Sequence, residues 1–254
     1  MNPTPPARLH VILAPEVRLA VVIRRGPAKQ VCTILWNRST DEFTLGQWLK
    51  GRIYADRCDL SPDGRYFIYF AYDGRPHREH GPAWTAVSRA PWLKAIALYS
   101  KGSTWGGGGI FTGPRTYWLD SEHVCVQDTT EVQRDLSDVS PQVWHDRWAE
   151  AGWLDYVEVD ADGTKQLVIE KDLPHGWILR RKRRRDIYEL EHVLSKAVWP
   201  FPGWGWAELD GHRLVWAEKG CLYTAVLDRE NGIGASKLLH HFNAMKFESR
   251  AAPY

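Results

Sequence analysis

A motif that recurs about every 50 residues constrains the fold of this chain more than any other feature. Each copy consists of a turn, a basic residue and a run of apolar residues, and successive copies lie 47 to 50 residues apart. A fixed period of this length is typical of repeat architectures, in which one structural unit is copied along the chain. The basic residues that begin the five runs are Arg18, Arg65, Arg115, Lys165 and Arg213.

The residues around these positions predict β-hairpins. The turns at 61–64, 160–163 and 210–211 end in Asp-Gly, which favours hairpin turns because glycine adopts a positive φ without a steric clash. A second short extended run precedes each turn, so each repeat is predicted to begin with a hairpin. These first runs lie at 11–13, 57–60, 110–111, 156–159 and 206–209.

Two further extended runs follow the hairpin in most repeats, and residues 123–127 are expected to form the third strand of the third repeat. Four strands in about 50 residues match one blade of a propeller, and ring closure removes exposed sheet edges. We therefore expect an all-β, five-bladed β-propeller with four-stranded blades, forming a single domain over residues 1–254. The further runs lie at 31–36 and 43–48, 85–88 and 94–99, 177–179 and 187–194, and 222–227 and 237–241.

The third repeat is irregular and is predicted to contain one short helical insertion near 140–151. Ser140 suits the N-cap, Pro141 the first helical position and Gly152 the position just beyond the end. Trp144 and Trp148 are four residues apart and would share the apolar face of this helix.

Several stretches resemble a known family. The segment from Leu60 to Phe67, with its Ser-Pro-Asp-Gly turn, resembles the hairpin of WD-like, TolB-type bacterial propellers. The stretches at 23–27, 51–54, 84–89 and 105–109 resemble an uncharacterised bacterial propeller family, and this resemblance spans most of the chain. The resemblance implies a propeller fold and no particular activity. The chain departs from true WD repeats because no repeat carries their Gly-His and Trp-Asp pair.

Composition and charge limit the partners that we expect. The net charge is only +2, so there is no global field to attract nucleic acid or an anionic membrane. The N-terminal residues form neither a signal peptide nor a membrane span, and we expect a cytoplasmic protein. The four cysteines, Cys32, Cys58, Cys125 and Cys221, lie in apolar stretches and are expected to be buried free thiols.

Glycine, tryptophan and arginine residues form the candidate ligand site. The chain has 14 tryptophans, which either fill gaps between sheets or stack ligands. Glycines next to them either admit a ligand or allow strands to converge. Arginines near the channel either hold a carboxylate or phosphate or form salt bridges between blades, with Glu42, Asp56 or Asp59. The candidates are Arg25, Arg52, Arg57, Arg89, Trp105, Gly106, Gly107, Trp204 and Trp206, with Arg57 placed on a channel-lining strand.

Two other groups of charged residues have alternative explanations. Asp59, Glu158 and Glu208 occupy comparable first-strand positions, where they either act as catalytic carboxylates or alternate with apolar residues as in any half-buried strand. The run Arg180, Arg181, Lys182, Arg183, Arg184 and Arg185 either binds an acidic partner or nucleic acid, or forms a solvated hairpin tip. The histidines are scattered, so no metal site and no cofactor are expected.

The sequence therefore favours a binding or scaffold protein. Its partner would be a small polar or anionic ligand, or a peptide or protein, held at one mouth of the channel, and nucleic acid is not favoured. One alternative is a glycosidase-like or lyase-like enzyme that uses channel carboxylates. The other is a scaffold that binds a partner or nucleic acid through the basic hairpin at 180–185.

Overall fold

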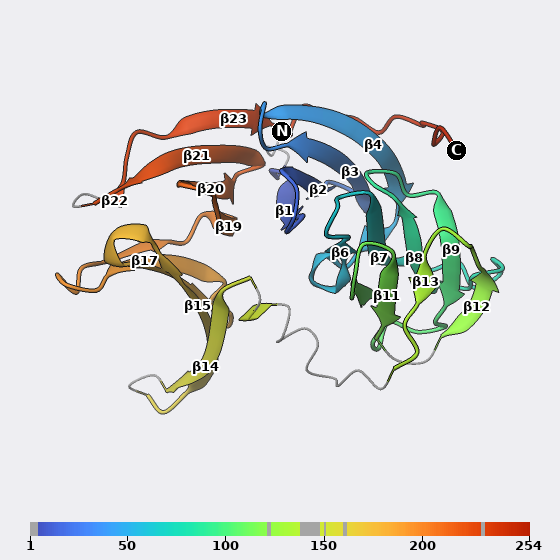
Figure 1. Cartoon of the computed structure of the whole chain (residues 1–254), viewed down its shortest axis with the longest axis horizontal. Helices are drawn as coiled ribbons and strands as arrows, with labels where there is room; N and C mark the ends of the chain where they lie inside the picture. The colour runs from blue at the N-terminus through green and yellow to red at the C-terminus, as the bar shows by residue number, and fades with distance from the viewer. Residues whose placement is uncertain (1–4, 121–122, 138–147, 150, 160–161, 230–231) are drawn as a thin grey trace. The chain divides into compact units, whose positions relative to one another are not determined.

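The computed structural model describes residues 5–120, 123–137, 148–149, 151–159, 162–229 and 232–254. Its regular structure is almost entirely β-strand, arranged in several antiparallel sheets (Figure 1). The chain forms two compact units, unit 1 from Met1–Pro141 with Ala244–Tyr254 and unit 2 from Gln142–Asn243. Within the described ranges, no helix is long and apolar enough to cross a membrane.

The first sheet of unit 1 confirms the strands expected for the first repeat. Its four strands pair in chain order, each antiparallel to the next. The second strand is buried almost throughout, as expected for a strand with both faces covered. The strands are β1 (Arg8–Leu13), β2 (Leu19–Arg25), β3 (Gln30–Asn37) and β4 (Glu42–Lys50).

The second sheet has an interrupted first strand and an additional outer strand. A 3₁₀ turn, η1 (Ala55–Arg57), separates the two short segments that pair with β7. The strand order is β12-β9-β8-β7-β5, with β6 also on β7. The strands are β5 (Arg52–Ile53), β6 (Asp59–Leu60), β7 (Tyr66–Tyr72), β8 (Ala83–Arg89), β9 (Ala95–Ser100) and β12 (Val124–Gln127).

Two sequence-based expectations fail in the second sheet. Residues 123–127 were expected to form the third strand of the third repeat, but β12 pairs with β9 and extends the second sheet. The exposed edge of β9 offers it a ladder of backbone groups, and sequence spacing does not show which edge a strand will join. Arg57 was expected on a strand and instead ends η1.

The third sheet is small. The hairpin of β10 (Gly109–Phe111) and β11 (Thr116–Leu119) forms as expected, and β13 (Gln133–Arg134) pairs parallel to β11. The first strands of unit 1 lie side by side, with β6 beside both β1 and β10. One apolar core fills the space between the first two sheets, and another fills the space between the second and third.

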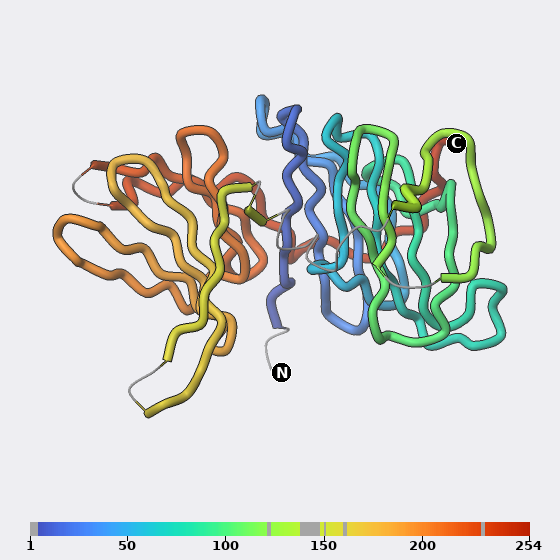
Figure 2. Tube along the Cα trace, turned by 60° about the horizontal axis from the view of Figure 1, so that its bottom comes forward, coloured from blue at the N-terminus to red at the C-terminus, as the bar shows by residue number. Residues whose placement is uncertain are grey.

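The segment after unit 2 returns to unit 1 as an irregular strap over the first and second sheets (Figure 2, red). Arg24 donates a hydrogen bond to the carbonyl oxygen of Met245 at 3.3 Å. Gln47 donates to the carbonyl oxygen of Arg250 at 2.8 Å. At the end of the strap, the hydroxyl of Tyr254 donates to the Lys94 carbonyl oxygen at 2.7 Å.

Unit 2 contains the fourth and fifth sheets, both antiparallel. The fourth runs β14 (Trp153–Val159), β15 (Lys165–Leu173), β16 (Trp177–Lys182), β17 (Ile187–His192) and β18 (Val198–Phe201), with the turn η2 (Pro174–Gly176) after β15. In the fifth, β19 (Trp204–Asp210), β20 (Arg213–Glu218) and β21 (Cys221–Asp228) pair in order, and both β22 (Gly232–Ile233) and β23 (Lys237–His241) pair with β21. The expected hairpins of both repeats are confirmed.

Large aromatic rings fill the core between the two sheets of unit 2. Phe201 stacks on Trp204 with ring centroids 4.0 Å apart, and Trp204 stacks on Trp216 at 5.1 Å. Trp216 in turn stacks on Tyr223 at 5.8 Å. This continuous stack accounts for part of the high tryptophan content by packing alone.

The cysteine prediction is partly wrong. All four thiols are free, and Cys32, Cys58 and Cys221 are buried, but Cys125 is exposed because it lies on the outermost strand β12. Burial raises the pKa of Cys32 to about 12, so this thiol stays protonated at neutral pH. The predicted helical insertion near 140–151 falls mainly on residues outside the described ranges.

Candidate functional site

Arg57 is bound to the glycine-rich segment that follows Trp105. Its guanidinium donates hydrogen bonds to the carbonyl oxygens of Thr104 at 2.9 Å and Gly106 at 2.6 Å. The same group lies over the rings of Tyr54, at 5.3 Å, and Phe70, at 5.4 Å. Arg57 therefore holds this loop against the second sheet, and these donors are already used inside the protein.

The glycines of this segment are required by close packing. A Cβ at Gly107 would lie 2.5 Å from the Phe70 ring, and one at Gly108 would lie 2.4 Å from the carbonyl oxygen of Arg57. Both glycines also have a positive φ, of 91° and 98°. The arrangement supports the interpretation that glycine lets strands converge. Trp105 itself is 86% exposed and forms no wall in unit 1.

A second arginine group lies where β1 begins, β2 ends and β5 begins. Arg8 and Arg25 stand directly opposite each other on β1 and β2. Opposite residues of an antiparallel pair point to the same face, with Cβ atoms about 4.5–5.5 Å apart, and like charges there repel. Arg52 on β5 adds a third positive charge close enough to affect Arg25. We call Arg8, Arg25 and Arg52 the arginine cluster.

Charges of both signs lie near Arg25. Partial burial is the main cause that lowers its pKa; Arg8 and Arg52 lower it further, while Asp56 and Cys58 oppose them. The Nε of Arg25 is buried and has no hydrogen-bond partner among the described residues. None of the three guanidinium groups forms an ion pair within the described part of the chain.

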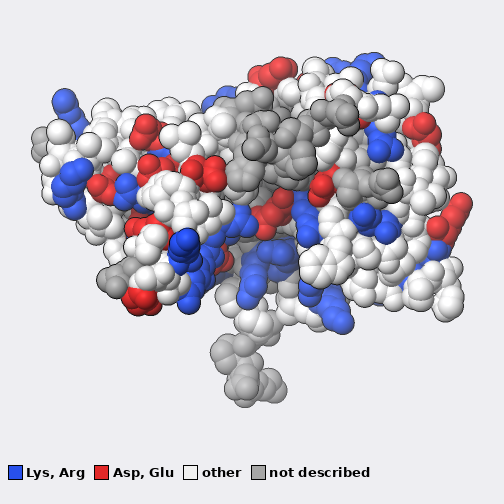
Figure 3. All heavy atoms as spheres, turned by 90° about the horizontal axis from the view of Figure 1, so that it is seen from below, with Lys and Arg blue, Asp and Glu red and all other residues white. Residues whose placement is uncertain are grey.

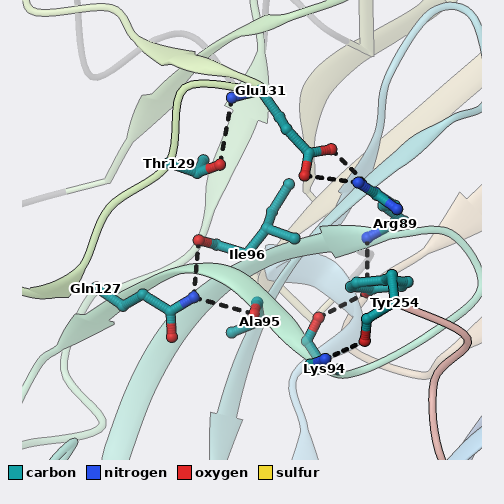
Figure 4. Close-up of polar contacts among 8 residues, drawn as sticks. All are labelled: Arg89, Lys94, Ala95, Ile96, Gln127, Thr129, Glu131 and Tyr254. Atoms are coloured by element: carbon teal, nitrogen blue, oxygen red, sulfur yellow. Dashed lines mark hydrogen bonds and ion pairs between the residues drawn. The ribbon is translucent and has the colours of Figure 1, made fainter.

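Arg89 is already neutralised (Figure 4). Its guanidinium donates two hydrogen bonds to the carboxylate of Glu131, at 2.9 and 2.7 Å. It also lies over the ring of Tyr254, 4.6 Å from the centroid. The backbone N–H of Arg89 donates to the hydroxyl of Tyr254 at 3.1 Å. Arg89 therefore joins the second sheet to the strap and offers no vacant anion site.

Trp204 and Trp206 are core residues of unit 2. They are 4% and 7% exposed, and Trp204 belongs to the aromatic stack described above. The sequence indicated that they would wall a ligand site, but burial leaves little of either ring for a ligand. A Cβ atom at Gly205, which lies between them, would approach a described atom no closer than 4.0 Å, so crowding does not require a glycine at this position.

The three candidate catalytic carboxylates each have partners within their own unit. Asp59 is buried and accepts the backbone N–H of Phe111 at 2.8 Å, which ties the second sheet to the third. Glu158 accepts from Gln166 at 3.0 Å and lies 3.4 Å from Lys182. These bonds support a structural role for both residues.

Glu208 has the most partners of the three. Its carboxylate accepts hydrogen bonds from Lys171 and from the indole of Trp153, both at 2.7 Å. It also accepts from the backbone N–H of Leu209 at 2.9 Å. These contacts link the fourth and fifth sheets, because Trp153 and Lys171 belong to the fourth sheet and Glu208 to the fifth.

The basic run forms the end of β16 and the turn before β17, as the sequence predicted. Arg180 pairs with Glu170 at 2.7 Å and also with Glu191. On the face of unit 2 in Figure 3, at the left, basic and acidic side chains are interspersed. Further ion pairs of the run join Arg181 to Asp186, and Lys182 to Glu158 and Glu189.

Arg8 is the member of the arginine cluster that sequence reasoning missed. The signal was present, because the hairpin register that pairs 11–13 with 20–22 also places position 8 opposite position 25. Among the described residues, no group of three or more His, Cys, Asp and Glu side chains is placed to hold a metal ion.

No protein-family model matches this sequence, and no curated protein matches it.

Proposed function

We propose that this protein is a binding module that takes a small ligand with a carboxylate or phosphate group at the arginine cluster. The observation that carries the proposal is the cross-strand pair of Arg8 and Arg25, with Arg52 nearby and with no ion pair to any of the three among the residues that the structure describes. Like charges that face each other across two paired strands destabilise a sheet. An anion bound between them would attract both, so the same two charges would then stabilise the sheet.

The chemistry of the group suits such an anion. A guanidinium presents a planar fork of donors that matches a carboxylate or phosphate. The buried Nε of Arg25 is a donor without a hydrogen-bond partner in the described part of the chain. Arg52 lies over the ring of Tyr54, with 5.8 Å from guanidinium to centroid, which restricts its position without using its donors.

The test is a titration with inorganic phosphate and with succinate at constant ionic strength, followed by calorimetry. We expect Arg25→Gln to weaken binding by about tenfold or more, because a hydrogen bond to a charged group contributes about 1.5–3 kcal/mol. Arg184→Gln is the matched control, because it removes the same charge from an exposed turn residue of unit 2. Equal affinities for wild type and Arg25→Gln would refute the proposal.

A second readout needs no ligand affinity. Without an added anion, Arg8→Gln should raise the Tm, since it removes the repulsion with Arg25. In excess phosphate the same variant should lose this advantage or become the less stable form, since the ligand stabilises only a protein that binds it. If the Tm difference is the same in both buffers, no anion occupies the cluster.

We also propose that the five sheets are the blades of one propeller in a cytoplasmic protein of the TolB-type bacterial kind. What supports this is the correspondence between the five repeats and the five sheets, in the order of the chain. Within unit 1, β1, β6 and β10 lie side by side as the inner strands of successive blades would.

A further inference from the structure

Unit 1 contains a pocket that is separate from the arginine cluster. It has a volume of about 500 Å³, within the range of small-molecule sites. It lies beside the end of β9, the start of β12 and the strand β13. The lining residues are Ser100, Lys101, Gly102, His123, Val124 and Arg134.

Three of the described side chains that line this pocket are basic. Lys101 and Arg134 line it together with His123, and none of the described lining residues is acidic. Burial raises the pKa of Asp120, and Lys101 lies close enough to this carboxyl group to oppose the rise. The Nε of Arg134 is buried and has no hydrogen-bond partner among the described residues. A buried donor without a partner is costly, and a bound acceptor would remove that cost.

Two of the side chains that line the pocket, those of Arg134 and His123, are held by contacts with other residues of unit 1. The Arg134 guanidinium lies over the Tyr99 ring at 5.8 Å, and the hydroxyls of Tyr99 and Tyr117 are hydrogen-bonded at 2.6 Å. The Nε2 of His123 lies 2.9 Å from the Thr85 hydroxyl, which accepts the backbone N–H of Gly108 at 2.9 Å. Side chains fixed in this way need little reordering to bind a ligand.

We infer that this pocket binds a small molecule through a carboxylate or phosphate group. The acidic group lies between Lys101 and Arg134, where the planar guanidinium donates to two oxygens and the ammonium adds a second charge. The rest of the ligand occupies the space beside Val124 and Gly102. This site is independent of the arginine cluster and does not rest on the function proposed for it.

The test uses the full-length protein and follows backbone amide signals by NMR during titration with inorganic phosphate or succinate at constant ionic strength. We expect the signals of Gly102, Val124 and their neighbours to shift with saturation. Shifts with phosphate alone identify a phosphate ligand, and shifts with succinate alone identify a carboxylate ligand. Absence of shifts with both probes overturns the inference.

Matched variants assign the effect to the pocket. Lys101→Gln and Arg134→Gln should each weaken binding about tenfold or more, whereas Arg25→Gln and Arg184→Gln should leave the pocket signals unchanged. Arg134→Lys keeps the positive charge but removes the planar guanidinium that can donate to two oxygens, so this variant should bind more weakly than wild type. If Arg134→Gln disturbs folding, Lys101→Gln decides, and unchanged affinity in that variant overturns the inference. If the pocket signals shift but Arg25→Gln binds phosphate and succinate as tightly as wild type, the pocket inference stands and the arginine cluster is refuted.

Discussion

The arginines of unit 1 differ in whether the protein supplies their acceptors. Arg57 donates to two loop carbonyl oxygens, and Arg89 donates to Glu131. The buried Nε of Arg25 has no partner within the described ranges, and Arg8 and Arg52 as well as Asp56 lie near this residue. At the level of sequence these residues look alike, because each lies beside a strand or a turn. Only the placement of acceptors separates structural arginines from candidates for ligand binding.

The pair of Arg89 and Glu131 gives a prediction about pH. Hydrogen bonds from Arg89 hold the pKa of Glu131 below its usual value. A carboxyl group with a lowered pKa in the folded state stabilises the protein above its unfolded pKa, about 4.3 for glutamate, and loses that contribution as pH falls through the folded value. Glu131→Gln should therefore lower the Tm modestly at pH 7 and have progressively less effect below about pH 4.

Thermal unfolding from pH 7 to pH 3 measures this difference. Glu79→Gln is the control, since Glu79 is exposed and has no ion pair among the described residues. A Tm difference between wild type and Glu131→Gln that stays constant into the acid range would show that the pair does not act as described.

At the level of elements, the hairpins followed from the sequence because turn chemistry is local. The turn at Ser61–Gly64 shows why. The Ser61 side chain accepts the backbone N–H of Tyr66 at 2.9 Å, and the Asp63 side chain accepts that of Arg65 at 3.1 Å. The edge that β12 joins was not predictable in this way, since it depends on a backbone ladder formed by residues 24 or more positions earlier. Nor did local pattern reveal η1, which interrupts the first strand of the second sheet.

The glycine-rich loop gives a prediction at this scale. Gly108→Ala should destabilise unit 1 by about 1–3 kcal/mol from its positive φ and by typically about 1–3 kcal/mol more from overpacking against the Arg57 carbonyl. Gly102→Ala, also at a positive φ but with nothing within 4 Å of the Cβ position, should show only the first loss. Urea unfolding measures both, and equal losses would exclude crowding as the reason for Gly108.

For the whole molecule, the period of the repeat predicted the number and order of the sheets, because each repeat carries its own turn signals. The two proposed ligand sites were less predictable. Arg25 and Arg52 were found from their positions beside glycines, whereas the pocket depends on β12 and β13. Both strands lie in a stretch whose strand pairing could not be predicted from the sequence. Lys101, His123 and Arg134 are spread over 34 positions and carry no common motif.

The proposed closed ring predicts that the molecule unfolds in one cooperative step. Trp36 and Trp177 are fully buried, one in each unit, and replacing either by alanine should cost about 3–5 kcal/mol. In scanning calorimetry we expect a single unfolding transition, and its midpoint temperature should be lower in each variant than in wild type. Two transitions, with each substitution moving only one of them, would contradict the proposed ring.

The strap has a consequence for how the chain is connected. Since residues 244–254 pack with unit 1, unit 2 is an insertion tethered at both ends. A single cut at either junction would leave unit 2 bonded to only one segment of unit 1, either residues 1–141 or the strap, and release of unit 2 alone would need a second cut. On the ribosome, the N-terminal sheets must wait for the whole insertion to be synthesised before Tyr254 can dock beside Lys94.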